Sequence, residues 1–111
     1  MAKWLGAKHD EEKEVKMGIR AVVLNPKDNV GVALMYLESG TVLDLEVNGR
    51  TVSVKLAEAI AYQHKFSVAQ IDAGSKILKY GEVIGEATQD IKPGQHVHIH
   101  NMVGLRAKAK K

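Results

Sequence analysis

The stretch Ile91-Lys92-Pro93-Gly94-Gln95-His96-Val97 contains the pattern that decides the fold, because the chain repeats it twice more. An aliphatic residue, two turn residues, glycine, two further residues and a second aliphatic residue also occur in Leu37-Glu38-Ser39-Gly40-Thr41-Val42-Leu43 and in Ile71-Asp72-Ala73-Gly74-Ser75-Lys76-Ile77. Glycine adopts the positive φ that such a turn requires, and the aliphatic residues anchor the chain in a core. Three such corners in one small domain predict an all-β fold of short, bent strands.

The segments between these corners also favour strands. Residues 41–47 alternate apolar and polar side chains, and Asn48-Gly49 after them is a strong signal for a hairpin turn into residues 51–56. Residues 19–24 form a continuous apolar run that predicts another strand. The alternation therefore predicts one hairpin directly, and the apolar run predicts a strand before it.

Two segments are less decisive. Residues 30–37 are apolar throughout and fit either a strand or a helix. Residues 57–62 have helical propensity but are too few for more than one short helix. A chain of 111 residues, rich in branched aliphatics and with ten glycines, is expected to form one domain with mainly β structure.

The two ends differ from the domain expected over residues 18–105. Residues 1–17 carry mixed charges and are expected to form an appendage, either a short exposed helix or disordered. The tail at residues 106–111 carries four positive charges, so the net charge of +3 leaves −1 for the remainder. That balance argues against nucleic-acid binding. The chain has no cysteine, no membrane-length apolar run and no signal-peptide pattern, so we expect a cytoplasmic protein.

Three histidines at alternate positions, His96, His98 and His100, are the most unusual chemical feature of the sequence. Side chains alternate between the two faces of a strand, so a strand here would place all three imidazoles on one face. The intervening Val97 and Ile99 would then point into the core. Imidazoles in such a row can bind a metal ion or transfer protons, although a solvated strand face is the simpler alternative.

Five short segments together resemble the SAF domain of the altronate and galactarate dehydratase family, which is also the small subunit of sulfolactate sulfo-lyase. They are Asp28-Asn29-Val30, His64-Lys65-Phe66, Lys79-Tyr80-Gly81, Ile84-Gly85 and His98-Ile99-His100-Asn101. The resemblance covers roughly residues 19–105 and implies a β-clip fold. The chain departs from the family at Gln63, where glycine is common, and His96 occupies a position that varies in the family.

The resemblance implies β-elimination from a hydroxy acid, with loss of water or of sulfite. This reaction removes a weakly acidic proton beside a carboxylate, so the site must stabilise an enediolate. A divalent ion, Fe²⁺ or Mn²⁺, meets that need and suits imidazole ligands. The resemblance assigns acid–base catalysis or metal binding to His98 and His100. It assigns substrate binding to Lys65, Lys79, Tyr80, Asn101, Asp28 and Asn29, with supporting roles for His64, Gly81 and Gly85. Asn101 can alternatively orient a neighbouring residue.

Structural roles compete with several of these assignments. Asp28-Asn29 after a proline is typical of an Asx turn, and both Gly81 and Gly85 are expected to be turn glycines. Tyr80 can pack its ring at a turn instead of donating its hydroxyl to a substrate. A chain this small is expected to need a large catalytic subunit to enclose a sugar acid, and self-association remains open. A free-standing module that binds a metal or small acid without catalysis is the alternative.

Overall fold

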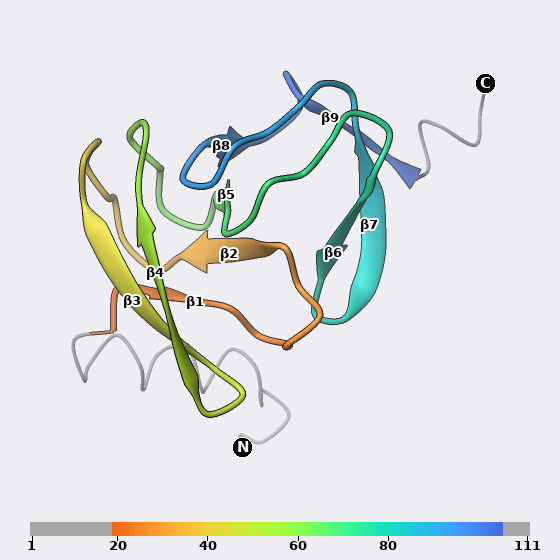
Figure 1. Cartoon of the computed structure of the whole chain (residues 1–111). Helices are drawn as coiled ribbons and strands as arrows, with labels where there is room; N and C mark the ends of the chain where they lie inside the picture. The colour runs from red at the N-terminus through yellow and green to blue at the C-terminus, as the bar shows by residue number, and fades with distance from the viewer. Residues whose placement is uncertain (1–18, 106–111) are drawn as a thin grey trace, which may run out of the picture.

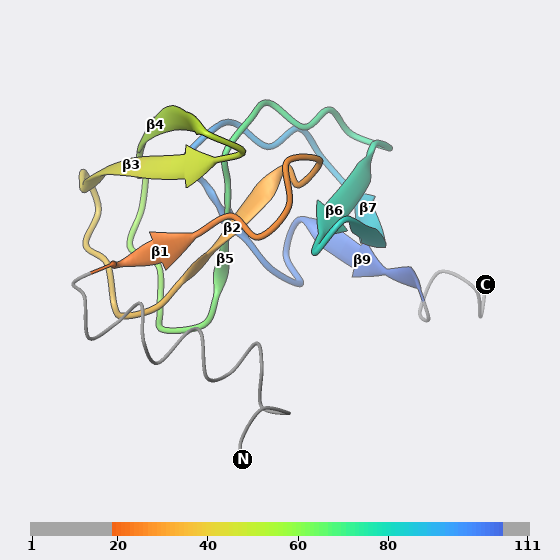
Figure 2. The ribbon, with the colours of Figure 1, turned by 90° about the horizontal axis from the view of Figure 1, so that it is seen from below.

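The computed structural model describes residues 19–105, which form nine short antiparallel strands. The strands are β1 (Ala21–Val22), β2 (Val30–Ala33), β3 (Val42–Val47), β4 (Arg50–Lys55), β5 (Lys65–Ser67), β6 (Lys76–Lys79), β7 (Glu82–Ala87), β8 (His96–Val97) and β9 (Met102–Gly104). They build a four-stranded sheet in the order β1-β2-β5-β8, a β3-β4 hairpin and a three-stranded sheet in the order β6-β7-β9. The four-stranded sheet lies between the other two (Figures 1 and 2). The all-β prediction is confirmed.

The three glycine corners are also confirmed. Gly40, Gly74 and Gly94 each have a φ of 88°. In each turn, the N–H of the residue after the glycine donates to the carbonyl of the residue two before it. The aliphatic residues that begin and end the three corners are all buried: Leu37, Leu43, Ile71, Ile77, Ile91 and Val97. The predicted turn at Asn48-Gly49 joins β3 to β4, and both of its residues have positive φ.

A fourth corner of the same shape occurs at Ile60-Ala61-Tyr62-Gln63-His64-Lys65-Phe66 and was not predicted, because glutamine replaces the glycine. Gln63 has a φ of 68°, a left-handed conformation that is unusual for a residue with a Cβ. Its N–H donates to the carbonyl of Ala33 over 2.8 Å. At the corner formed by residues 91–97, the Gly94 N–H donates in the same way to the carbonyl of Ser67 over 2.7 Å.

The four corners associate in two pairs. An antiparallel β-bridge joins Leu37 to Ile60, and another joins Ile71 to Ile91. Each bridge consists of two backbone hydrogen bonds of 2.7–2.9 Å. These bridges bring together segments that lie twenty or more residues apart in the sequence, so the corners fold the strands into a closed arrangement instead of a flat meander.

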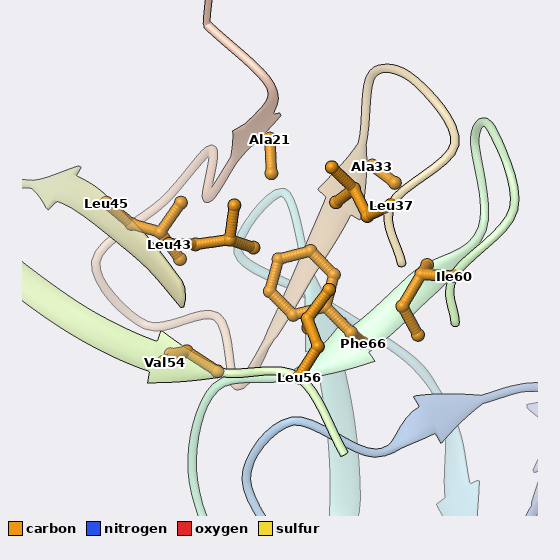
Figure 3. Packing of buried hydrophobic residues seen from close by; sticks show 9 residues of the cluster. All are labelled: Ala21, Ala33, Leu37, Leu43, Leu45, Val54, Leu56, Ile60 and Phe66. Atoms are coloured by element: carbon orange, nitrogen blue, oxygen red, sulfur yellow. The ribbon is translucent and has the colours of Figure 1, made fainter. Parts of the chain in front are cut away.

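The two larger hydrophobic cores lie on opposite sides of the four-stranded sheet, and a smaller cluster contains Val22, Val32 and Leu34. One lies toward the β3-β4 hairpin, with the Phe66 ring among Leu43, Leu56 and other aliphatic side chains (Figure 3). The second contains Val97, together with side chains from β2, β6 and β7. Because the neighbouring strands β5 and β8 contribute to different cores, burial on both sides restrains the register in which they pair.

The structure shortens one predicted strand and decides two segments that the sequence left open. Only Ala21–Val22 of the apolar run at residues 19–24 forms a strand, and residues 30–37 contain β2 followed by bends. Residues 57–62 form turns and a bridge, without a helix. The predicted N-terminal appendage and basic tail lie outside the described residues.

Candidate functional site

Two of the four corners bring His64, His96 and His98 close together. The corner at Gln63 leads into His64 and β5, and the corner at Gly94 leads into His96 and β8. The two strands pair antiparallel, with Lys65 opposite Val97 and Phe66 opposite His96. His64 directly precedes β5 and His98 directly follows β8, so both lie next to this pairing. Cross-strand neighbours lie about 5 Å apart, so the β5-β8 pairing brings these residues close together.

The imidazole rings of His64, His96 and His98 form a stacked cluster, called here the histidine cluster. The ring centroids of His64 and His98 lie 4.7 Å apart, those of His64 and His96 5.1 Å, and those of His96 and His98 5.3 Å. His64 Nδ1 lies 2.8 Å from His96 Nε2, which is a hydrogen bond between the two rings. One potential ligand atom from each residue lies within 4.8 Å of the others. All three residues are half-buried.

The predicted row of three histidines on one strand is wrong. Strand β8 ends at Val97, and residues 98–101 form a turn. Val97 is fully buried as expected, but Ile99 is 81% exposed instead of pointing into the core. His100 is exposed, and its ring lies 5.4 Å from that of His96 in a tilted orientation. The turn therefore places His100 at the rim of the cluster, and His64, which directly precedes β5, takes the predicted third position.

Asn101 holds this turn in place. Its side chain is 2% exposed, its amide oxygen accepts the N–H of His98 over 3.0 Å, and its amide nitrogen donates to the carbonyl of His96 over 2.8 Å. The Glu58 carboxylate also holds this segment, because it accepts the N–H of His96 over 2.9 Å. The predicted substrate-binding role of Asn101 is untested, and these contacts favour the alternative in which it orients its neighbours.

The environment favours the neutral forms of His96 and His98. Burial lowers the pKa of His96, and the other three imidazoles lower it further, while the Glu58 carboxylate acts in the opposite direction. The pKa of His98 is also lowered, first by burial and then by His64, a nearby lysine and His100. A neutral imidazole has a free lone pair, so it can accept a proton or bind a metal ion.

A lysine pair adjoins the histidine cluster. Burial lowers the pKa of the Lys65 ammonium, and the charge of Lys79 lowers it further. Lys65 is also the lysine that acts on His98. The Nζ of Lys79 lies 5.0 Å from the centroid of the Tyr80 ring, a cation–π contact. Of the predicted anion-binding residues, Lys79 thus contacts the Tyr80 ring, and Lys65 lies within electrostatic reach of both Lys79 and His98.

Asp28 and Asn29 connect the first loop to the β6-β7 hairpin. The Asp28 carboxylate, 8% exposed, accepts the N–H groups of Tyr80 and Gly81 over 2.9 Å and 2.7 Å. The Asn29 side chain donates to the carbonyl of Lys76 and accepts the N–H of Leu78. Both side chains thus position the hairpin that carries Lys79 and Tyr80. Their predicted contact with substrate is untested.

The two glycines of the same hairpin differ. Gly81 is a turn glycine as predicted, with a φ of 77°. Gly85 lies within β7 opposite Gly104, so the prediction of a turn there is wrong. A Cβ at Gly85 would lie 2.5 Å from the carbonyl oxygen of Val103. Glycine is needed at this position for the close approach of β9.

The fit of a divalent ion rests on the three clustered imidazoles. The sequence pointed to His98 with His100, whereas the structure groups His98 with His64 and His96. A separate groove of about 420 Å³ lies between β4 and the first loop and is lined in part by Val23, Pro26 and Arg50, without any of the histidines. The histidine cluster, and not this groove, therefore offers the ligands that an ion needs.

The fold and cluster define a small all-β domain that presents imidazoles and lysines at its surface. Residues 19–105 match the family described as the altronate/galactarate dehydratase SAF domain, and the chain belongs to that family. This confirms the resemblance drawn from the five sequence segments.

Individual relatives fall into two groups. The chain is 40% identical over 80 residues to an altronate dehydratase of Escherichia coli and 35% identical over 80 residues to that of Bacillus subtilis, covering 72% of this chain and 15% of each relative. It is 34% identical over 89 residues to the (2R)-sulfolactate sulfo-lyase subunit alpha of Chromohalobacter salexigens, covering 78% of this chain and 95% of that subunit. The chain thus corresponds to a small part of the dehydratases and to nearly all of the sulfo-lyase subunit.

The described part of the chain, residues 19–105, contains no helix long and apolar enough to cross a membrane.

Proposed function

We propose that this chain is the small subunit, or a domain, of a sugar-acid dehydratase similar to altronate dehydratase. In this role it contributes the histidine cluster and the adjoining lysines to a β-elimination site completed by a larger catalytic partner. The observation that carries the proposal is the convergence of His64, His96 and His98 beside Lys65 on a domain of this family. Because the chain spans only 15% of the matched dehydratases, most of the active site is assigned to the partner. The proposal places the complex in the cytoplasm.

The lysines would bind the carboxylate of the hydroxy acid. Lys65 and Lys79 lie close enough to lower the pKa of Lys65 through charge repulsion, and a carboxylate placed between them would relieve that repulsion. The two lysine ammonium groups would also stabilise the negative charge that develops when the neighbouring carbon loses its proton. Tyr80, against Lys79, can add a hydroxyl donor at the edge of this site.

The imidazoles would have two separate roles, metal binding and proton transfer. His64, His96 and His98 would hold a divalent ion, which when bound supplies Lewis-acid polarisation of the carboxylate and of the departing hydroxyl. His100, exposed at the rim of the cluster, is left to move a proton. In the elimination, a base takes the proton from the carbon beside the carboxylate. Its electron pair forms the carbon–carbon double bond, and the hydroxyl on the next carbon leaves as water after protonation.

A second candidate is a sulfo-lyase role, in which sulfite leaves in place of water. It is favoured by the match along 95% of the (2R)-sulfolactate sulfo-lyase subunit alpha. The first steps at the carboxylate are the same in both reactions, so the residues of this chain fit either one. The two candidates differ in the leaving group, which the partner would contact.

The test is turnover by the chain mixed with its large partner, identified as the neighbouring reading frame. Altronate, galactarate and sulfolactate are supplied separately with Fe²⁺ or Mn²⁺, while keto-acid product and sulfite are measured. We expect keto acid without sulfite from a sugar acid, and nothing from either protein alone. Sulfite release from sulfolactate would establish the second candidate. Absence of turnover by the complex on all three acids would reject both and favour a binding module without catalysis.

A further inference from the structure

We propose that the full chain binds one divalent transition-metal ion by itself, through one imidazole nitrogen each from His64, His96 and His98. It should bind Zn²⁺ more tightly than Fe²⁺, and Fe²⁺ more tightly than Mn²⁺. This inference deepens the proposed function by stating that the chain binds the ion without its partner and which ions it prefers, and it rests on that function only for its role in catalysis. His100, which sequence spacing placed among the ligands, is excluded from the set.

The distances fit a site that closes around an ion. Ligand nitrogens around a tetrahedral ion, about 2.0–2.1 Å from it, lie about 3.3 Å from one another. The three nitrogens lie within 4.8 Å of one another, so ring rotations and shifts of about 1 Å bring them into position. The side chains are half-buried, which leaves an open side for such adjustment and for an incoming substrate oxygen.

The hydrogen bond between two of the rings must be exchanged for metal bonds. Of His64 Nδ1 and His96 Nε2, 2.8 Å apart, one carries the proton and the other accepts it. Binding of both nitrogens to an ion requires the donor ring to move its proton to its other nitrogen, a change of tautomer without a change of charge. The bond therefore competes with the metal but also holds the two nitrogens close together beforehand.

The backbone beneath the cluster is fixed, which favours a preformed site. The buried Asn101 amide binds the backbone on both sides of Val97, and Glu58 binds the N–H of His96. Groups that position ligands in this way commonly account for 10- to 100-fold in metal affinity. Nearby positive charge from Lys65 opposes cation binding, and the Glu58 carboxylate partly offsets it.

The ligand chemistry sets the order of affinities. The proposed set contains three nitrogens and no thiolate or carboxylate. Imidazole suits zinc, copper, iron and nickel, whereas manganese favours oxygen ligands. The general order of affinity for nitrogen sites also places Mn²⁺ below Fe²⁺ and both below Zn²⁺.

The experiment measures metal binding by the purified full chain, with the metal alone as the probe. Zn²⁺ affinity is determined by competition with a chromophoric chelator, and Co²⁺ is added separately because its visible spectrum reports nitrogen ligation. We expect one equivalent of Zn²⁺ to bind, with weaker binding of Fe²⁺ and weaker still of Mn²⁺. At a Zn²⁺ concentration 100 times the dissociation constant, the thermal midpoint should rise by about 10 °C.

Four matched variants test the ligand set. His64→Gln, His96→Gln and His98→Gln should each weaken Zn²⁺ binding by about 100-fold or more, beyond the loss expected for a supporting residue. His100→Gln should change it less than about threefold, a small fraction of a ligand's effect. Thermal unfolding without metal confirms that each variant is folded. The proposal is overturned if the wild-type chain binds no Zn²⁺, if His100→Gln weakens binding as much as the other three, or if Mn²⁺ binds more tightly than Zn²⁺.

These outcomes are separable from those of the proposed function. Metal binding is measured without partner or substrate, so a chain that binds Zn²⁺ but supports no turnover would leave the ligand assignment standing and reject the dehydratase role. Turnover by a complex whose small chain binds no metal would support the dehydratase role and reject the ligand assignment.

Discussion

Replacing Gly94 by alanine should damage the protein far more than the same change at the two other glycine corners. Gly40, Gly74 and Gly94 have the same φ of 88°, so the backbone strain of an added Cβ is common to all three. A Cβ at Gly40 or Gly74 would meet nothing within 4 Å. A Cβ at Gly94 would lie 2.1 Å from the carbonyl oxygen of Lys55 and 3.1 Å from the backbone nitrogen of Ala57.

The magnitudes follow from these distances. Strain at positive φ costs about 1–2 kcal/mol, which is the whole effect expected for Gly40→Ala and Gly74→Ala. Gly94→Ala adds the displacement of a packed backbone segment, about 1–3 kcal/mol. It also breaks the hydrogen bond from Ala57 N–H to the Gly94 carbonyl if the two segments separate. We therefore expect a loss about 2 kcal/mol larger at Gly94 than at Gly40.

Urea denaturation followed by circular dichroism measures the free energy of unfolding of the three variants and the wild type. A common slope with urea would show that the change lies in stability and not in the unfolded state. Because the Gly94 corner leads into His96, Gly94→Ala should also weaken Zn²⁺ binding, whereas Gly40→Ala should not. Losses at Gly94 and Gly40 that agree within about 0.5 kcal/mol, the usual range for a neutral surface substitution, would refute the steric argument.

Three further predictions concern the site and its supports. Burial lowers the pKa of His96 and His98 below the ordinary value of 6.5, so folding favours their neutral forms. In the presence of a chelator, the free energy of unfolding should therefore reach its full value above pH 6.5. It should fall as the pH drops through 6.5 toward the lowered pKa values. Replacing both by glutamine should flatten that fall in thermal midpoint, and an unchanged slope would contradict the assignment. Gln63→Gly should stabilise the chain by about 0.5 kcal/mol, since relief of left-handed strain outweighs the added freedom of glycine in the unfolded chain; a loss above about 1 kcal/mol would show that the Gln63 side chain itself contributes. Ile99→Glu should leave the thermal midpoint nearly unchanged, because Ile99 is 81% exposed, but it should weaken association with the large partner in sedimentation or pull-down with purified proteins; unchanged association would place the partner's contact elsewhere.

The sequence was sufficient where the determining interactions are local. The turns at Gly40, Gly74 and Gly94 and the hairpin at Asn48-Gly49 were predicted because positive φ strongly favours a few residue types. The alternation over residues 41–47 likewise placed Leu43 and Leu45 in the core. These local signals establish an all-β domain, and the five quoted segments identify its family.

Only the tertiary structure assembled the site. His64 lies 32 residues before His96, and no local pattern shows that their segments pair. That pairing depends on hydrophobic cores to which strands β1 to β8 all contribute residues. Gln63 concealed a corner because packing and backbone hydrogen bonds impose a conformation that its own residue type disfavours. Alternation alone predicted a strand through His100, but the buried Asn101 amide binds the backbone at His96 and His98 and turns the chain outward. Local chemistry thus determined where the chain bends, whereas long-range packing decided which imidazoles meet.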